Sequence, residues 1–171
     1  MTLLVLSAGD LPGLLPYPEV VEVMGQALAA LAAGHACQPV RTVLQPPGAA
    51  GLMVLMPCYL PPAGGAADEP GYGLKAICVS PGNPALGKDA HQGGVASESG
   101  DFLLAVADGA IGAGHIRAEL GEVLAGRAPG RADDQEITVF ESLGLAVEDF
   151  AAAVLAYRKA LASGAGTRVD F

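Results

Sequence analysis

The chain has 171 residues, of which 51% are hydrophobic and only 16% are charged. This length and composition predict one globular domain with a sizeable core and exclude a disordered chain. The net charge of −9 argues against nucleic acid and anionic membranes as partners, since both would repel it. No apolar run approaches the length of a membrane-spanning helix, and the first residues lack the features of a signal peptide. We therefore expect a cytoplasmic protein.

Strands dominate the first two thirds of the predicted fold. We expect strands at residues 2–6, 40–45, 51–60 and 74–79, a helix at 19–33, and a hairpin of residues 91–97 and 102–107. The apolar face of the helix runs from Val20 to Leu31, and Gly34 follows as a stop. In the strand at 40–45 the side chains alternate, so Arg41 and Val43 share one face.

Helices dominate the chain after residue 108. A glycine-rich joint at 109–114 leads into a helix at 116–125, a strand at 137–140 and a long helix at 146–163. The long helix is expected to bury Phe150, Val154 and Leu161. This order predicts a single α/β domain of the α+β kind, with a mixed or antiparallel sheet flanked by helices, rather than a series of βαβ units.

The glycine-rich joint contains part of a dinucleotide-binding pattern. Gly112 and Gly114 follow a predicted strand and precede a helix, but Arg117 replaces the third glycine of G-x-G-x-x-G. The βαβ unit that completes such a pocket is not expected here. We therefore interpret the segment as a flexible joint and expect this chain to bind no nucleotide cofactor.

Two cationic side chains lie inside apolar strands. Arg41 lies in the middle of one predicted strand and Lys75 interrupts another, where an isolated charge would be costly. One interpretation is that both bind the carboxylate of a small ligand. The alternative is that both extend to solvent or pair with distant acids such as Glu141 or Asp149.

The other reactive side chains indicate no catalytic group. His91 is a lone histidine at the start of a strand, where a structural hydrogen bond is its ordinary role. Cys37, Cys58 and Cys78 are widely spaced and form no C-x-x-C pair, which predicts buried, reduced thiols rather than a metal site or disulfides. There is no Ser–His–Asp spacing and no cluster of metal ligands.

Short motifs run through the whole chain in an order and at a spacing that occur together in one protein family. In the first half they are Gln38-Pro39-Val40-Arg41-Thr42, Met56-Pro57 with Tyr59, Lys75 ahead of Pro81-Gly82-Asn83-Pro84, and His91-Gln92-Gly93. In the second half they are the segments 119–127, 129–131, 137–144 and 146–149. By these motifs the chain resembles the ornithine cyclodeaminase/mu-crystallin family over nearly its full length.

The resemblance implies an NAD(P)-dependent chemistry at the α-carbon of an amino or imino acid. The family includes ornithine cyclodeaminases, alanine dehydrogenases, and ketimine and pyrroline-carboxylate reductases. In it, both chain ends form a substrate domain, a Rossmann domain is inserted between them, and substrate domains pair into a homodimer with a barrel-like interface. By resemblance, Arg41 and Lys75 bind the substrate carboxylate, and Lys75 also has a catalytic role. Met56, Asn83 and His91 are further substrate-binding candidates.

The sequence departs from the family pattern in its middle. After Asp108 and Gly109 it lacks the family's further arginine, its glycine motif and its catalytic aspartate. We therefore expect one substrate-binding and dimerisation domain, made of residues 1–109 and 115–171 with a linker at 110–114, and no Rossmann domain. Val54 replaces an acidic residue of the ornithine-cyclising members, which favours the dehydrogenase or reductase branches.

Two functions of different kinds remain open. The chain is the substrate-binding domain of such an enzyme, inactive alone because the cofactor domain is absent, or it is a non-catalytic dimeric scaffold with no retained ligand. A cofactor-free reaction is disfavoured because no nucleophile or tuned acid–base pair is visible. Either function predicts a homodimer, since the sheet edges and the apolar surface need a partner.

Overall fold

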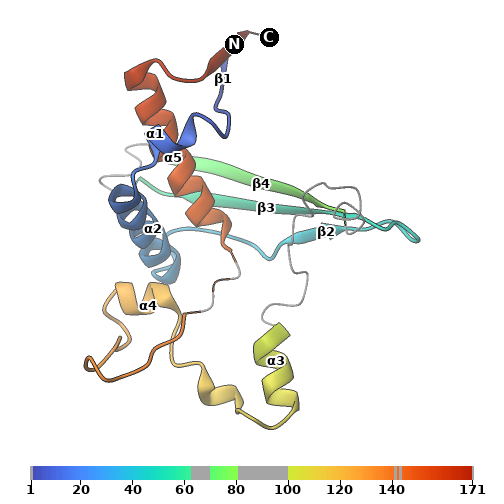
Figure 1. The fold of residues 1–171 in the computed structure, drawn as a ribbon, viewed down its shortest axis with the longest axis vertical. Helices are drawn as coiled ribbons and strands as arrows, with labels where there is room; N and C mark the ends of the chain where they lie inside the picture. Colours follow the sequence, from blue (N-terminus) through green and yellow to red (C-terminus); the bar gives the residue numbers. More distant parts are fainter. Residues whose placement is uncertain (1, 63–69, 81–99, 141, 143, 171) are drawn as a thin grey trace.

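The structure, a computed structural model, describes residues 2–62, 70–80, 100–140, 142 and 144–170. These residues form a three-stranded and a two-stranded antiparallel sheet together with helices (Figure 1). The predicted class, an α/β domain with antiparallel sheets and flanking helices, is confirmed. The predicted strand at 91–97 and the residues Asn83, His91 and Glu141 lie outside the described residues.

The larger sheet has the order β2-β3-β4, with β2 at Thr42–Leu44, β3 at Leu52–Leu60 and β4 at Gly71–Val79. Because side chains alternate between the faces of a strand, one face of β3 collects the buried residues. These are Val54, Met56, Cys58 and Leu60. The strands predicted at 51–60 and 74–79 are confirmed, and β4 begins three residues earlier than predicted.

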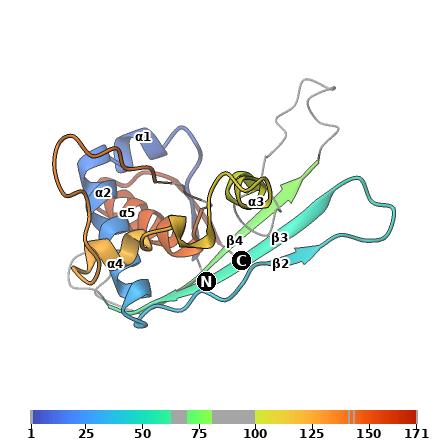
Figure 2. The ribbon, with the colours of Figure 1, turned by 90° about the horizontal axis from the view of Figure 1, so that it is seen from below.

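Two long helices cover this face of the sheet (Figures 1 and 2). They are α2, at Tyr17–Ala32, and α5, at Ala146–Ser163. Val23 and Ala27 of α2 meet Val147 and Ala151 of α5 in the main core. An ion pair of 2.6 Å between Lys159 Nζ and a Glu19 carboxylate oxygen also joins the two helices.

The helix α5 lies close to the sheet because β4 carries glycine where the two meet. A Cβ built on Gly73 would lie 2.5 Å from Cδ2 of Phe150 and 3.0 Å from Sγ of Cys58. Gly71 leaves the same kind of space for the far edge of the Phe150 ring. The ring therefore packs directly on the backbone of β4, which brings the start of α5 to the middle of the sheet.

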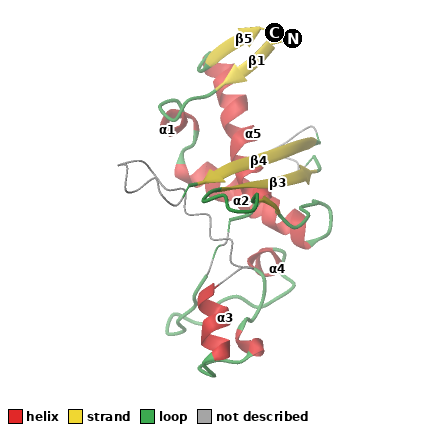
Figure 3. Ribbon diagram, turned by 90° about the vertical axis from the view of Figure 1, so that its right-hand side faces the viewer, coloured by secondary structure: helices red, strands yellow, loops and turns green. Residues whose placement is uncertain are grey.

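The smaller sheet joins the two ends of the chain. The strand β1, at Thr2–Val5, pairs antiparallel with β5, at Thr167–Asp170, and Figure 3 shows this pair at one extremity of the molecule. Between this pair and α5 lies a second, smaller core. It is formed by the short helix α1 (Leu11–Leu14) and the alanines Ala156 and Ala160.

The other extremity holds α3 (Gly100–Ala107), a 3-10 helix (Ala113–His115) and α4 (Leu120–Leu124). Of these, α4 packs on α2 through Gly121. A Cβ on Gly121 would lie 2.4 Å from the Leu28 carbonyl oxygen.

Two predicted strands are wrong. Residues 102–107 belong to the helix α3, because a short apolar run has no periodicity that distinguishes a helix from a strand. Residues 137–140 form no strand, and their side chains are exposed, with Ile137 91% and Val139 89% accessible. A strand needs a neighbour for its backbone hydrogen bonds, and none pairs with 137–140 among the described residues.

Smaller predictions also need correction. Cys58 is buried as predicted, but Cys37 and Cys78 are exposed. Cys78 is exposed because it points to the open face of the sheet. Leu161 is 45% exposed rather than buried, and alanines take its place against the sheet. Within the described residues, no helix is long and apolar enough to span a bilayer.

Candidate functional site

Lys75 lies in the middle of β4, an edge strand of the larger sheet, on the face covered by helices. It is directly opposite Met56 in the antiparallel register of β4 and β3. Met56 is 5% exposed, and Lys75 is half-buried beside it. The alternation of β4 therefore turns the ammonium toward α5, while its neighbours Leu74 and Ala76 point to the open face.

Arg41 precedes β2 rather than lying within it, which corrects the predicted mid-strand position. The pairing of β2 with β3 aligns Thr42 with Leu55, and Arg41 is the residue directly before this pair. On the other side of β3, Met56 pairs with Lys75 of β4. Arg41 and Lys75 are both half-buried and belong to the segments that flank β3 on its two sides.

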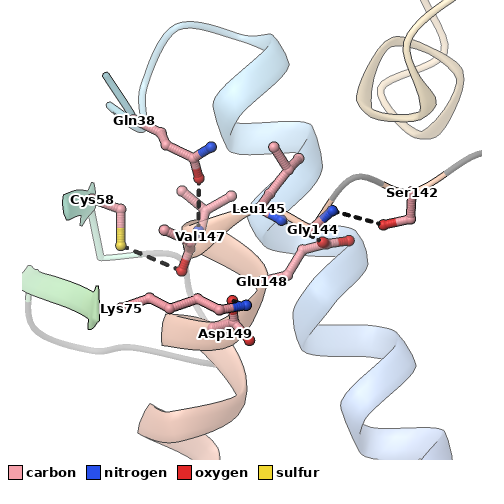
Figure 4. Close-up of polar contacts among 10 residues, drawn as sticks. Gln38, Cys58, Lys75, Ser142, Gly144, Leu145, Val147, Glu148 and Asp149 are labelled. Atoms are coloured by element: carbon pink, nitrogen blue, oxygen red, sulfur yellow. Dashed lines mark hydrogen bonds and ion pairs between the residues drawn. The ribbon is translucent and has the colours of Figure 1, made fainter. Parts of the chain in front are cut away.

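Asp149 of α5 meets the ammonium of Lys75. The Nζ atom lies 2.8 Å from Oδ2, and the side chains are 29% and 49% exposed respectively (Figure 4). Asp149 belongs to the first turn of α5, where the helix dipole stabilises a negative charge. The pairing with a distant acid, one of the two interpretations of Lys75, is therefore present in the structure.

The start of α5 is held by side chains from two directions. Gln38 Oε1 accepts a hydrogen bond of 3.0 Å from the backbone N–H of Val147, and the Glu148 carboxylate accepts one of 3.3 Å from that of Leu145 (Figure 4). These contacts satisfy donors that a helix leaves unpaired at its first turn. Since Gln38 is three residues before Arg41, it also ties that segment to α5. Sequence reasoning quoted Gln38 as part of a motif but gave it no role.

Cys58 closes the inner side of the site. Its thiol donates to the carbonyl oxygen of Ala146 at 3.4 Å, and the side chain is 4% exposed. Burial raises the pKa of the Cys58 thiol, and the nearby Asp149 carboxylate raises it further. Cys58 is therefore a neutral packing group that fixes α5 on β3, and it does not supply a thiolate at neutral pH.

The described residues do not fit a dinucleotide. Gly112 and Gly114 lie at a 3-10 turn rather than between a strand and a long helix, and the helix that follows, α4, has five residues. A dinucleotide pocket needs a strand, a glycine turn and the start of a helix in one unit. The described residues also include no group of three or more His, Cys, Asp or Glu side chains that could hold a metal ion.

Solved structures share this fold. The fold aligns with an archaeal alanine dehydrogenase dimer with bound NAD at a TM-score of 0.77 and 17% identity, over 100% of both chains. It aligns with Δ1-pyrroline-2-carboxylate reductase from Thermococcus litoralis, in complex with NADH and L-proline, at a TM-score of 0.78 and 19% identity, over 98% of this chain and 100% of that one. The fold is thus one used by dehydrogenases and imine reductases.

Sequence comparison finds a family likeness in the second half of the chain. Residues 90–164 match the family described as Ornithine cyclodeaminase/mu-crystallin family. A Δ1-pyrroline-2-carboxylate reductase of Bacillus thuringiensis is 45% identical over 74 residues, which are 43% of this chain and 23% of that protein. The mouse ketimine reductase mu-crystallin is 53% identical over 60 residues, 35% of this chain and 16% of that protein. Residues 90–164 are thus similar to the family that the motifs indicate, and the chain matches less than a quarter of the length of these relatives.

Proposed function

We propose that this chain is the substrate-binding and dimerisation domain of an NAD(P)-dependent amino-acid dehydrogenase or imine reductase of this family. Its part is to hold the carboxylate of an amino or imino acid at Arg41 and Lys75. In the complete enzyme the hydride would come from a cofactor bound by a separate Rossmann domain. Residues 1–109 and 115–171 form the substrate domain, and the linker at 110–114 stands where that domain is inserted in relatives.

One observation carries the proposal: Lys75 lies opposite Met56 beside the start of α5, and Arg41 directly precedes β2, the strand on the other side of Met56. Two cations that converge on one position are suited to a carboxylate, which accepts from several donors at once. The family match and the amino- and imino-acid chemistry of the relatives supply the ligand class. Asn83 and His91 complete the proposed substrate contacts, and Lys75 would assist proton transfer in the complete enzyme.

The test is to titrate the purified chain separately with L-proline, L-alanine and NADH and to monitor binding by NMR chemical shifts. We expect millimolar binding of the amino acids that is weakened at least about tenfold in Lys75→Met and Arg41→Met, because each removes one charged contact of about 1.5–3 kcal/mol. Lys159→Met is the matched control, since Lys159 forms a similar ion pair with Glu19 away from the site. Micromolar NADH binding or substrate-dependent turnover by this chain would contradict the absence of a cofactor domain.

A second candidate is a dimeric scaffold with no ligand. It is favoured by the ion pair of Lys75 with Asp149, because a cation that already has an internal partner has less need of an external one. In this case none of the amino acids shifts the spectrum, and Lys75→Met changes stability alone.

The proposed homodimer uses the open face of the larger sheet. Leu44, Tyr72 and Leu74 on that face are 59%, 86% and 64% exposed. Tyr72 also stacks at 5.2 Å, in a tilted arrangement, on Tyr59 of the neighbouring strand. A monomer rarely exposes so large an apolar patch. The archaeal relative of the same fold is a dimer, so we assign this face to a second copy, with the two sheets closing into a barrel-like interface.

A further inference from the structure

The carboxylate of Asp149 is placed to meet a ligand as well as Lys75. One oxygen, Oδ2, lies 2.8 Å from the Lys75 ammonium, while the side chain as a whole is 49% exposed. Among the described residues, the side chain of Asp149 makes no other hydrogen bond or ion pair. The carboxylate therefore has unused acceptor positions at the edge of the proposed carboxylate site.

Of the described polar groups at the start of α5, the others are engaged in hydrogen bonds. At the start of α5, the N–H of Leu145 and that of Val147 are bonded to Glu148 and Gln38. Glu148 is occupied by that bond, so Asp149 is the acid of this turn that faces the sheet (Figure 4). An anionic part of a ligand is thus directed to the cations, and a cationic part to Asp149.

The charges of the site then describe a zwitterion. Arg41 and Lys75 contribute two positive charges to the proposed carboxylate site, and Asp149 contributes one negative charge directly beside Lys75. The carboxylate of an α-amino acid complements the first two, and its ammonium group, one carbon away, complements the third. A ligand with a hydroxyl or keto group in place of the ammonium has no positive charge for Asp149. Its carboxylate then lies near the Asp149 carboxylate, and the two negative charges repel each other.

We propose that Asp149 is a specificity-determining residue that recognises the ammonium or iminium group of the ligand. It makes the site select amino and protonated imino acids over hydroxy and keto acids of the same size. This inference rests on the proposed carboxylate site. It concerns the discrimination between ligands, whereas the proposed function concerns whether any of them binds.

The experiment compares L-alanine with L-lactate, which differ only in the ammonium and hydroxyl groups, by NMR titration of the wild-type chain. We expect the wild type to bind L-alanine more tightly by about three- to tenfold, the range of a partly exposed charge pair. Asp149→Asn, which keeps the shape and removes the charge, should abolish the preference by weakening L-alanine and strengthening L-lactate. Asp149→Glu should retain part of the preference, and Asp134→Asn, on an exposed loop, should leave it unchanged.

The outcomes separate the two proposals. If the wild type and Asp149→Asn bind neither acid, the proposed carboxylate site is wrong and this inference is overturned with it. If both acids bind but the wild type does not prefer L-alanine, or if the preference survives in Asp149→Asn, the carboxylate site stands and the role of Asp149 is refuted. Thermal unfolding of each variant confirms that a lost signal does not come from a lost fold.

Discussion

Cys58 is the buried thiol of the three, and its environment determines its chemistry. It lies against the start of α5 with its hydrogen directed at the Ala146 carbonyl oxygen. Cys37 and Cys78 are exposed. We therefore expect a thiol reagent at pH 8 to modify two cysteines rapidly and the third only when the chain unfolds, with Cys58→Ala losing the slow phase. Rapid modification of all three thiols in the folded chain would contradict this packing.

The same thiol predicts a loss of stability at alkaline pH. The pKa of Cys58 is raised in the folded state by burial, so the unfolded chain releases this proton first. Stability from this group is complete below the ordinary thiol pKa of about 8.5 and falls as the pH rises through the higher folded value. Denaturant unfolding from pH 7 to 10 should show a steeper fall for the wild type than for Cys58→Ala. Parallel curves would exclude the thiol as the cause.

Gln38 is the residue by which the segment of Arg41 is attached to α5. Replacement by Met keeps most of the volume but removes the acceptor for the Val147 N–H, which should cost about 1 kcal/mol, as for the loss of a helix cap. Chemical denaturation measures this cost, with Gln135→Met in an exposed loop as the control. In the amino-acid titration of the proposed function, Gln38→Met should also weaken L-alanine binding. If only stability changes, the role of Gln38 is confined to capping α5.

At the scale of elements, two glycines on neighbouring helices should respond oppositely to alanine. Gly121→Ala brings a methyl group against the backbone of Leu28, which cannot move aside, and should destabilise the chain by about 1–3 kcal/mol. Gly25, inside α2, has no atom within 4 Å of its added Cβ. Gly25→Ala should therefore stabilise by about 0.5–1 kcal/mol through helix propensity. Thermal or denaturant unfolding decides both signs, and equal effects would show that α4 does not pack closely on α2.

The elements differ in how far their sequences predict them. The helix α5 was predicted with its observed bounds because its start and end carry their own signals, and β3 was predicted to within one residue. The strand β5 was missed because its four exposed residues carry no alternating pattern, and its partner β1 lies at the other end of the chain. Residues 137–140 carry strand propensity, but propensity alone gives no neighbour to pair with.

The candidate site, too, could be predicted only in part from the sequence. Arg41 and Lys75 stand out in sequence because charges are rare in apolar strands, and Asp149 could be named as one partner among several. Its position opposite Lys75 depends on how α5 crosses the sheet, which the close contact of Phe150 with Gly73 determines. A tertiary contact between residues 74 positions apart has no local signature in the sequence.

For the whole molecule, the proposed homodimer depends on the open face of the larger sheet. Leu74→Asp places a charge in the middle of the apolar patch and should shift the dimer to monomer, with at least about a tenfold rise in the dissociation constant. Light scattering coupled to size exclusion measures the state. Tyr17→Asp is the matched control, because Tyr17 is 80% exposed at the start of α2, away from this sheet. A wild-type chain that is monomeric at high micromolar concentration would refute the homodimer.

The pairing of β1 with β5 makes the backbone almost a closed ring. Thr2 lies opposite Asp170, and their side chains share a hydrogen bond of 2.7 Å. A short linker that joins these two residues would allow the chain to be opened at another position. The exposed turn between β2 and β3, where the Ala49 N–H bonds the Pro46 carbonyl oxygen, is a suitable new break. A circular permutant that starts at Ala49 should keep the same sheet and the pairing of Met56 with Lys75, with Arg41 now close to its C-terminus.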